Sequence, residues 1–353
     1  MTEEEDEYPS VAIIVLNWNG WEDTIECLES VYHINYPNYE VVVVDNGSRD
    51  DSIQKIKKYT KGKIRPKMGY IDYKSDNKPI KVLEVEEREG KLVKSKGKDL
   101  RPLPSEKKMV LIKNSKNYGF SRGNNIGIKY SLKKGFNYVL LLNNDTIVKK
   151  DFLLNLVKNA ESEKNIGIVG AKIYYYNFRG RQDVISALGT DFNYWNLEGK
   201  RYGLNEVDRG QWHERREVDK VEGACMLLKR KLIEDVGLFD TDYFTYWEET
   251  DFCYRATSSG YKIVSVPEAA IWHKIGSSSG GSLSNHFIYY MTRNRLLFIK
   301  KNLNSFQKLT SLLFALLIHF PNRLSRLIFR KKAEGLLSFF RGLKDGLISS
   351  TSA

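Results

Sequence analysis

Polar and acidic side chains stand where four apolar runs of this sequence end. The runs at residues 11–16, 39–44, 109–112 and 139–142 are typical of buried strands, because apolar residues follow one another without alternation. Amides, carboxylates and a glycine follow these runs: Asn17, Asn19, Asp45, Asn46, Asn117, Gly119, Asn143, Asn144 and Asp145. Since ligands bind outside the carboxyl ends of strands in open α/β sheets, we expect these residues to line one site.

Asp145 is the member of this set best suited to hold a cation or a polar substrate. It ends the strand-like run at residues 139–142, directly after two amides. A carboxylate at such a position binds hard cations, although a carboxylate that only caps the next turn is the alternative. Four polar strand ends in one sheet favour a shared site over four independent caps.

A second acidic cluster contains Glu248, Glu249 and Asp251, between the aromatic residues Trp247 and Phe252. A carboxylate held beside a substrate hydroxyl accepts its proton and so acts as a general base. The alternative is an acidic helix N-terminus, which the helix dipole favours.

The elements that position these groups follow a β-α-β-α order. A helix-like segment at residues 22–31 follows the first run, and Ser48 and Asp51 resemble the ends of a capping box that opens the next helix. The alternation predicts a Rossmann-like, mostly parallel sheet with helices on both faces. Residues 61–108 interrupt it, and we interpret them as an inserted surface segment with a small hairpin around residues 80–85.

The composition is that of a globular chain of 353 residues, with 41% hydrophobic and 28% charged residues. Residues 1–9 form an acidic tail, the opposite of a signal peptide, which predicts a cytoplasmic protein. The three cysteines are far apart and lack metal-ligand spacing, which suits buried thiols in a reducing compartment.

The net charge of +12 is concentrated in the tail, since residues 287–353 contain twelve Lys or Arg and two acids. The apolar run at residues 312–320 is followed by Pro321, so it provides about half of the ~20 residues that span a bilayer, and we expect it not to cross. Basic amphipathic helices over residues 304–348 are expected to bind an anionic membrane surface from the cytoplasmic side. Packing on the rest of the chain or on a second subunit of a homo-oligomer is the alternative.

Nucleic-acid binding is not expected, despite a pI of about 9.3. The excess charge lies in an apolar tail and not on an identifiable recognition element.

Several motifs in a fixed order resemble a family 2 glycosyltransferase, a family with the GT-A fold, and in particular its rhamnosyltransferase-like members. The matching segments are residues 15–19, 44–48, 117–120, 123–125, 142–145, 236–240, 246–255, 272–273 and 293–295. The resemblance covers residues 10–301 without the insertion. It implies an inverting glycosyltransferase that moves a sugar from a nucleotide-sugar donor to a glycan or lipid-linked glycan acceptor. A noncatalytic nucleotide-sugar or glycan-binding protein on the same fold is the alternative.

The resemblance also implies roles for single residues at the donor site. Asp45 would accept hydrogen bonds from the base of the nucleotide, and the backbone near Leu16 and Asn19 would border the ribose. The further donor-binding residues would be Asn17, Asn46, Asn117, Gly119, Asn125, Asn143, Asn144 and Arg293.

The implied metal is Mg²⁺ or Mn²⁺, held by Asp145, which stands at the last carboxylate of the family's Asp-x-Asp motif. Asn143 replaces the first carboxylate of that motif. His273 is therefore expected to complete the metal site from a distant strand.

Glu249 occupies the position of the family's catalytic base, where an aspartate is usual, and Asp251 is the second choice. The strand-like segment at residues 221–228 carries Gly223 near its start and is expected beside the acceptor. The resulting domain prediction is an acidic tail (1–9), a catalytic domain (10–285, with 61–108 inserted) and basic amphipathic helices (286–353).

Overall fold

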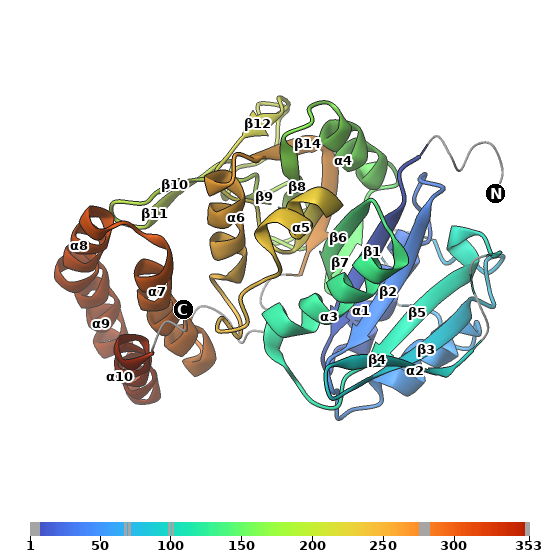
Figure 1. Ribbon diagram of the computed structural model, residues 1–353, viewed down its shortest axis with the longest axis horizontal. Coiled ribbons are helices and arrows are strands. Elements are labelled where there is room, and N and C mark those ends of the chain that lie inside the picture. Colours follow the sequence, from blue (N-terminus) through green and yellow to red (C-terminus); the bar gives the residue numbers. More distant parts are fainter. Residues whose placement is uncertain are drawn as a thin grey trace.

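A block of parallel strands forms the centre of the protein, for which the computed structural model describes residues 8–66, 69, 72–97, 100, 102–274 and 283–349. The strands β6 (Tyr138–Asn143), β1 (Val11–Asn17), β2 (Tyr39–Asp45) and β5 (Lys108–Lys113) lie side by side in this order, and all are parallel. The four apolar runs therefore end at the same edge of the sheet, as expected (Figure 1). Of the acidic tail, residues 1–7 lie outside the described residues.

Helices cover both faces of this sheet because alternate strand residues point to opposite sides. Val11, Ile13 and Val15 pack in one core cluster with α1 (Trp21–Val31), α2 (Ser52–Thr60) and α4 (Phe152–Glu161). Ala12 and Ile14 pack in a second cluster with α3 (Gly119–Lys134), α5 (Arg230–Val236) and α6 (Glu248–Ser258). The expected α/β architecture with helices on both faces of a mostly parallel sheet is confirmed.

Beyond β6 the sheet becomes mixed. β13 (Cys225–Lys229) pairs antiparallel with β6 and with β8 (Ile166–Tyr175), and β8 pairs parallel with β14 (Lys262–His273). The end of β14 pairs with the short β7 (Thr146–Val148), which directly follows β6. Two short strands, β9 (Ile185–Ala187) and β12 (Arg216–Glu217), complete this half. These pairings place the last residues of β14 beside the carboxyl end of β6.

Residues 61–108 contain the expected hairpin, formed by β3 (Lys81–Arg88) and β4 (Lys91–Lys96). The hairpin is not confined to the surface, because β3 also pairs in parallel with β5 and extends the central sheet. Leu83 and Val85 of β3 are buried in the core. The interpretation as a purely inserted surface segment was therefore wrong for these strands, and a short 3-10 helix, η2 (Ser105–Lys107), leads back into β5.

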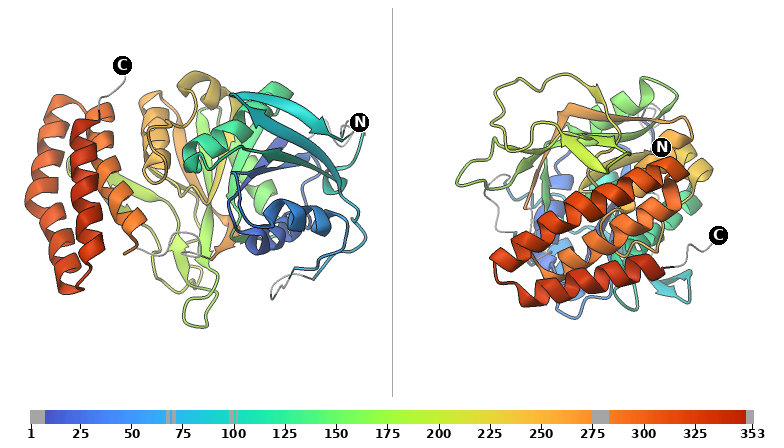
Figure 2. Two further views of the ribbon diagram at one scale, coloured as in Figure 1. Left: turned by 90° about the horizontal axis from the view of Figure 1, so that it is seen from below. Right: turned by 90° about the vertical axis from the view of Figure 1, so that its left-hand side faces the viewer.

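The C-terminal helices form a separate layer beside the sheet domain (Figures 1 and 2). They are α7 (Asn285–Asn302), α8 (Ser305–Phe314), a π-helical turn η3 (Ala315–His319), α9 (Phe320–Phe329) and α10 (Ala333–Ile348). The two-stranded hairpin of β10 (Thr190–Asn193) and β11 (Glu198–Arg201) reaches from the sheet domain to this layer.

Pro321 does not end the apolar helix, because α8, η3 and α9 form one helix over Ser305–Phe329. The wider π turn Ala315–His319, just before Pro321, accommodates the proline ring. The proline nitrogen cannot donate a helical hydrogen bond, and the changed bonding of this turn allows the helix to continue. This helix is long and apolar enough to cross a membrane, and 17% of its most apolar window is buried. One such helix is weak evidence for a membrane span. The expectation of a run half the required length was therefore wrong.

The helix α7 joins the two layers. Leu297, Phe298 and Ile299 pack with Tyr243 and Trp247 of the sheet domain, whereas Ile288 and Leu296 of α7 pack with the other C-terminal helices. α10 approaches α7 closely through Gly342 and Gly346, where an added Cβ would come within 2.6 Å of the carbonyl oxygen of Tyr289 and 2.9 Å of Leu296, respectively. The predicted domain boundary at residue 286 stays a prediction, and α7 contacts both sides of it.

Candidate functional site

The ends of β1 and β2 are tied together by hydrogen bonds between polar side chains. Asn17 Nδ2 donates to Asp45 Oδ1 at 2.8 Å, and the backbone amide of Ser48 donates to Asp45 Oδ2 at 3.1 Å. Ser48 Oγ in turn accepts from the backbone amide of Asn19 at 3.0 Å. Asn19 has a positive φ of 51°, a conformation that asparagine tolerates better than most residues. Asp45 is thus buried and held in place at the end of its strand.

The expected capping box at Ser48 was wrong. Asp51 is the N-cap residue of α2 but makes no side-chain capping bond, and Ser48 Oγ bonds instead to Asn17 and Asn19. The serine therefore shapes the first strand end and not the helix.

Asn46 connects the ends of β2 and β5 to the start of α3. Its Nδ2 donates to Asn117 Oδ1 and to the carbonyl oxygen of Gly119, both at 3.0 Å, and Asn117 Oδ1 accepts from the amide of Gly119 at 2.8 Å. Gly119 is required here because its φ is +79° and an added Cβ would lie 2.4 Å from the carbonyl oxygen of Phe244. Gly123 lets α3 approach Leu16 in the same way, since its Cβ would lie 2.8 Å from Leu16 Cδ1.

Asp145 and His273 meet at the end of β6, although they are far apart in the sequence. His273 Nε2 lies 3.0 Å from Asp145 Oδ1, and Asn143 Nδ2 lies 3.5 Å from the same ring nitrogen. The pairing of β14 with β7 places His273 opposite Thr146 and so creates this proximity. The prediction that His273 lies beside Asp145 is confirmed, whereas their role as metal ligands stays a prediction.

The arrangement of Asp145 and His273 fits a divalent cation. Adjacent ligands of an octahedral Mg²⁺ with bonds of 2.0–2.1 Å lie about 2.9 Å apart, close to the separation of these two atoms. Within the described residues no third His, Cys, Asp or Glu joins them to form a metal-binding group. A cation held here would therefore take its remaining ligands from substrate phosphates and water, as Mg²⁺ commonly does.

The neighbouring Asn144 and Lys274 brace this strand end. Asn144 Nδ2 donates to Thr24 Oγ1 at 3.0 Å, and Thr24 Oγ1 donates to Asn17 Oδ1 at 2.8 Å. Lys274 Nζ forms an ion pair with Asp23 of α1 at 2.6 Å, and its backbone amide donates to the carbonyl oxygen of Asp145. Residues 275–282, which follow in the chain, lie outside the described residues.

Glu249 lies in the first turn of α6, behind a strained segment. Tyr246 and Trp247 both have positive φ angles, 64° and 76°, which is costly for aromatic residues and is typical of functional positions. Glu249 Oε1 forms an ion pair with Lys220 Nζ at 3.2 Å. Burial, and then the charge of Glu249, raise the pKa of the adjacent Glu248 well above its ordinary value. The buried Glu248 side chain therefore favours its protonated form more than an exposed glutamate does.

The segment before β13 connects Glu249 to the metal-side strand. The carbonyl oxygen of Ala224 accepts from the amide of Asn143 at 3.0 Å, and a Cβ added to the preceding Gly223 would lie 3.9 Å from Glu249 Cβ. Burial raises the pKa of Glu222, but Lys220, Arg201 and His273 outweigh burial and hold it below its ordinary value. The carboxylates of Glu222 and Glu249 thus flank Lys220, whose pKa they raise against the opposing effect of burial.

Three expected site residues make contacts with other elements of the chain. Asp251 is buried, with Arg255 Nε at 2.8 Å from Oδ2 and Asn302 Nδ2 at 2.8 Å from Oδ1. Both polar atoms of the Asn125 side chain bond to the backbone of Phe239. Arg293 donates through Nη1 to the carbonyl oxygen of Asp242 at 2.9 Å. The roles of all three residues stay predictions.

The sequence had not pointed to Lys220, and Glu222 and Ser48 were expected only as members of longer segments. Lys220 and Glu222 lie three residues and one residue before Gly223, and these charges before a glycine were the available signal. Ser48 follows the strand end at Asp45 but resembled a helix cap.

Comparison with protein families gives two adjoining matches. Residues 10–93 match the family described as "Glycosyl transferase family 2", and residues 98–292 match "Glycosyltransferase like family 2". The first match includes all of β3 and ends within β4, which agrees with the place of β3 in the central sheet.

Two curated relatives are similar to this chain along most or half of its length. The low-salt glycan biosynthesis hexosyltransferase of Haloferax volcanii is 27% identical over 73% of this chain and 81% of its own length. The dTDP-rhamnosyl transferase of Shigella flexneri is 27% identical over 55% of this chain and 64% of its own length.

The solved structure of a mannosyltransferase from Pyrobaculum calidifontis, in complex with GDP-Man and Mn²⁺, has the same fold. The TM-score is 0.55 at 13% sequence identity, covering 98% of this chain and 88% of that chain. The match supports the GT-A architecture of the mostly parallel sheet.

Proposed function

Because the chain belongs to glycosyltransferase family 2 and is therefore a sugar-transferring enzyme that uses a nucleotide-sugar donor, we propose that it is a metal-dependent, inverting hexosyltransferase. The observation that carries this proposal is the contact of Asp145 with His273 at the end of β6, on the same sheet edge as the buried Asp45. A nucleotide diphosphate that spans this edge has its base near Asp45 and its phosphates near Asp145.

Asp145 and His273 would hold Mg²⁺ or Mn²⁺, which when bound offsets negative charge on the departing nucleoside diphosphate. The similar mannosyltransferase was solved with Mn²⁺, which supports a divalent cation for this chain. The residues themselves orient the donor: Asp45 accepts from the base, and Asn46 and Asn117 fix the loop at Gly119 beside it.

Glu249 would accept the proton of the acceptor hydroxyl as that oxygen attacks the anomeric carbon opposite the phosphates. Its contact with Lys220 Nζ at 3.2 Å holds the carboxylate in place. Gly223 lies between Glu249 and Phe120, where an added Cβ would be in ordinary contact with their atoms at 3.5–3.9 Å.

The acceptor is proposed to be a glycan, and in particular a lipid-linked glycan at the inner face of the cell membrane. The relative from Haloferax volcanii is named for glycan biosynthesis, which supports a glycan acceptor. The long apolar helix Ser305–Phe329, next to basic residues of α9 and α10, supports residence on an anionic membrane surface.

The experiment that tests this function incubates the purified chain with UDP-, GDP- and dTDP-sugars, with Mn²⁺ or Mg²⁺ or with a chelator. We expect release of nucleoside diphosphate from one donor, dependent on the cation and accelerated by the acceptor. Tight donor binding without release, in the presence of lipid-linked and free glycan acceptors, would instead identify a noncatalytic binding protein, which the amide at Asn143 in place of a carboxylate favours.

A further inference from the structure

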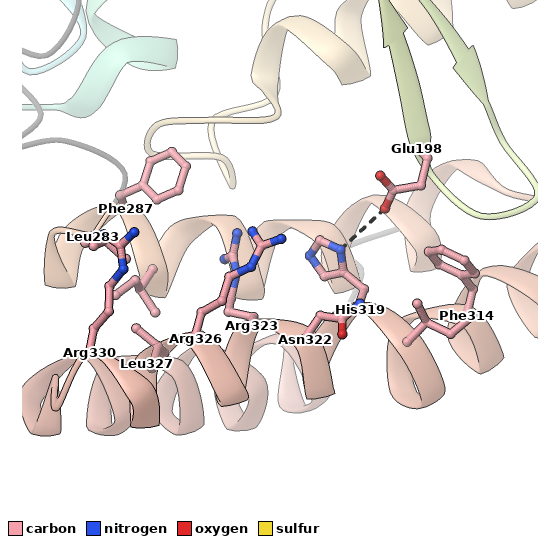
Figure 3. Close-up of a pocket in the computed structure, with 12 residues that line it drawn as sticks. Glu198, Leu283, Phe287, Phe314, His319, Asn322, Arg323, Arg326, Leu327 and Arg330 are labelled. Atoms are coloured by element: carbon pink, nitrogen blue, oxygen red, sulfur yellow. Dashed lines mark ion pairs between the residues drawn. The ribbon is translucent and has the colours of Figure 1, made fainter.

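A cavity of about 570 Å³ lies between α7 and α9, away from the sheet edge that binds the donor (Figure 3). One wall carries His319, Arg323, Arg326 and Arg330, which follow one another at helical spacings of four, three and four residues. These spacings place the four side chains on one face of α9 and its adjoining turns. A face that would normally carry apolar packing residues here carries three arginines and a histidine.

The other walls of this cavity are apolar. Phe287 of α7 lies opposite the arginines, and Phe314 lies at the end nearest His319 (Figure 3). Ile288 and Ile318 also line the cavity. Leu316 and Leu317, which directly precede the lining residue Ile318 in the chain, are 58% and 71% exposed. The cavity therefore combines a row of arginines with apolar walls, next in the chain to exposed leucines.

The arginine row has no carboxylate partner among the residues that the structure describes. Glu198, at the rim, contacts His319 Nδ1 and Arg295 Nη2, each at 3.4 Å, and is 51% exposed. Arg323 has a weak hydrogen bond to Thr292 Oγ1 at 3.4 Å and lies over the ring of Phe287. The positive charges of Arg323, Arg326 and Arg330 are therefore not neutralised by described acids.

The mutual repulsion in this row has an energetic signature. Burial, and then Arg326, lower the pKa of Arg323 below its ordinary value. Like charges that are brought together in a partly desolvated cavity raise the free energy of the folded state. An anion that binds between them removes this cost, so the cavity favours an anionic ligand.

We propose that this cavity binds the phosphate group of an amphiphilic phosphate ester, with its hydrocarbon chain along the apolar walls. Guanidinium groups bind phosphate oxygens in pairs and remain charged at all physiological pH values, which makes three arginines a strong phosphate site. A small free anion leaves the apolar walls unused, and a neutral lipid leaves the arginines unpaired. A lipid phosphate satisfies both halves of the cavity.

The location of the cavity links it to the proposed transfer site. The ring of Phe287, which lines the cavity, packs against the ring of Tyr246 at 5.1 Å between centroids. Tyr246 lies in the strained segment that directly precedes Glu248 and Glu249. A lipid phosphate bound beside Phe287 would therefore hold a lipid-linked acceptor near the proposed base, a step that rests on the proposed function.

The binding test uses the full chain and octyl phosphate below its micelle concentration, measured by titration calorimetry without sugar nucleotide or metal. We expect octyl phosphate to bind at least about tenfold more tightly than inorganic phosphate or octanol, because each of those fills one half of the cavity. Equal affinity for inorganic phosphate would reduce the site to a free-anion site, and equal affinity for octanol would reduce it to an apolar one. Either result overturns the proposal.

The arginines are tested with a matched control. Arg323→Gln combined with Arg326→Gln should weaken octyl phosphate binding by about tenfold or more, whereas Arg341→Gln should leave it unchanged. Arg341 is an exposed arginine of α10 outside the cavity, so its replacement removes one arginine charge from the same layer of helices. Equal weakening by both changes would mean attraction to the general charge of the tail and would overturn the site.

A second variant covers the case in which the double variant does not fold. Arg330→Gln alters an exposed side chain at the end of α9, so folding is not at risk, and it should weaken binding by about threefold or more. Unchanged binding in this variant would remove Arg330 from the site and contradict the row of three. Because the assay contains no donor, its failure is separate from a failure of sugar transfer.

Discussion

Glu249 is the residue on which the proposed chemistry depends most. It lies in the first turn of α6, directly after the strained residues Tyr246 and Trp247, and its carboxylate is paired with Lys220. Asp251, two residues later, has both oxygens occupied by Arg255 and Asn302. The two carboxylates of one helical turn thus have different environments, and different environments assign different roles.

Substitution of the two acids should separate these roles. Glu249→Gln removes the proton acceptor but keeps the size of the side chain, so kcat should fall by about 10²–10⁴ while the Kd of the donor is unchanged. Asp251→Asn should instead lower the free energy of unfolding by about 1–3 kcal/mol, because it weakens two buried charge-assisted hydrogen bonds. The measurements are steady-state kinetics, donor titration and urea unfolding. Loss of donor binding in Glu249→Gln would contradict its assignment as the base.

Substitution of Asp145 or His273 should change the binding of the cation and not the stability of the fold. Asp145→Ala is expected to abolish metal-dependent transfer, and His273→Ala to weaken the affinity for Mn²⁺ by about 10–100-fold, since one ligand remains. Titration with Mn²⁺, with hydrolysis of the donor as the readout, measures both the loss of activity and the change in Mn²⁺ affinity. Asp151→Asn, at an exposed carboxylate that precedes α4, is the control and should behave like the unchanged chain. Wild-type turnover in Asp145→Ala would show that the metal site is elsewhere.

At the scale of single elements, α9 carries a histidine whose charge state depends on folding. Burial, and then Arg295, Arg323 and Arg326, lower the pKa of His319 from 6.5 to about 3. Glu198 of β11 is half exposed and contacts both His319 and Arg295 at 3.4 Å. His319 is therefore neutral in the folded protein over the whole range in which an unfolded histidine takes up a proton.

This shift predicts a pH-dependent contribution to stability. The contribution is fully present above about pH 6.5 and is lost as the pH falls toward 3, because below pH 6.5 the unfolded chain gains a proton that folded His319 does not bind. The loss is about 1.4 kcal/mol per pH unit, or roughly 2 kcal/mol at pH 5. His319→Gln should reduce the decrease in unfolding free energy between pH 7 and pH 5 by this amount, as measured by urea unfolding. The exposed His213 provides the control variant, and an equal decrease in wild type and His319→Gln would contradict the prediction.

Local sequence patterns predicted the strands and their polar ends well, because continuous apolar runs and the residues directly after them are neighbours in the chain. The contact of His273 with Asp145 was predicted only through the family resemblance, since it depends on the pairing of β14 with β7. Pairing also decided the place of β3, whose alternating pattern did not distinguish a surface hairpin from an edge of the main sheet. The prediction that the apolar helix ends at Pro321 was wrong, because a π turn before the proline lets the helix continue. The local sequence pattern does not indicate such a turn.

From the sequence, the basic residues of α9 were recognised only by their charge and not as the lining of a cavity. The pattern at residues 319, 323, 326 and 330 has the spacing of a buried helix face, but its basic residues were assigned to a membrane surface. The packing of α9 beside α7 turned part of that surface into a cavity. Nonlocal packing thus changed the interpretation of residues whose types were known from the start.

For the whole molecule, the arrangement of two layers predicts that donor binding and membrane binding are separable. α7 is fixed to the sheet domain: Asn294 donates to the carbonyl oxygens of Thr245 and Tyr246, and Lys301 pairs with Asp240 at 2.6 Å. A chain that ends at Leu303 keeps these contacts and lacks α8–α10. It should bind the donor with unchanged affinity and lose binding to vesicles of phosphatidylcholine and phosphatidylglycerol.

Truncation also uncovers Ile288 and Leu296 of α7, so a second variant of the full chain tests the membrane contact without this disturbance. Leu313 and Leu317 are 47% and 71% exposed, and replacing both with Gln leaves the core unchanged. Two leucines transferred into lipid contribute about 3 kcal/mol together, so the double variant should lower the vesicle partition coefficient on the order of hundredfold. Co-sedimentation with vesicles measures this coefficient, and Val93→Gln, an exposed apolar residue of β4, is the control. Unchanged partitioning of the double variant would mean that the apolar face of the long helix packs against protein, such as a second copy of the chain, and not against lipid.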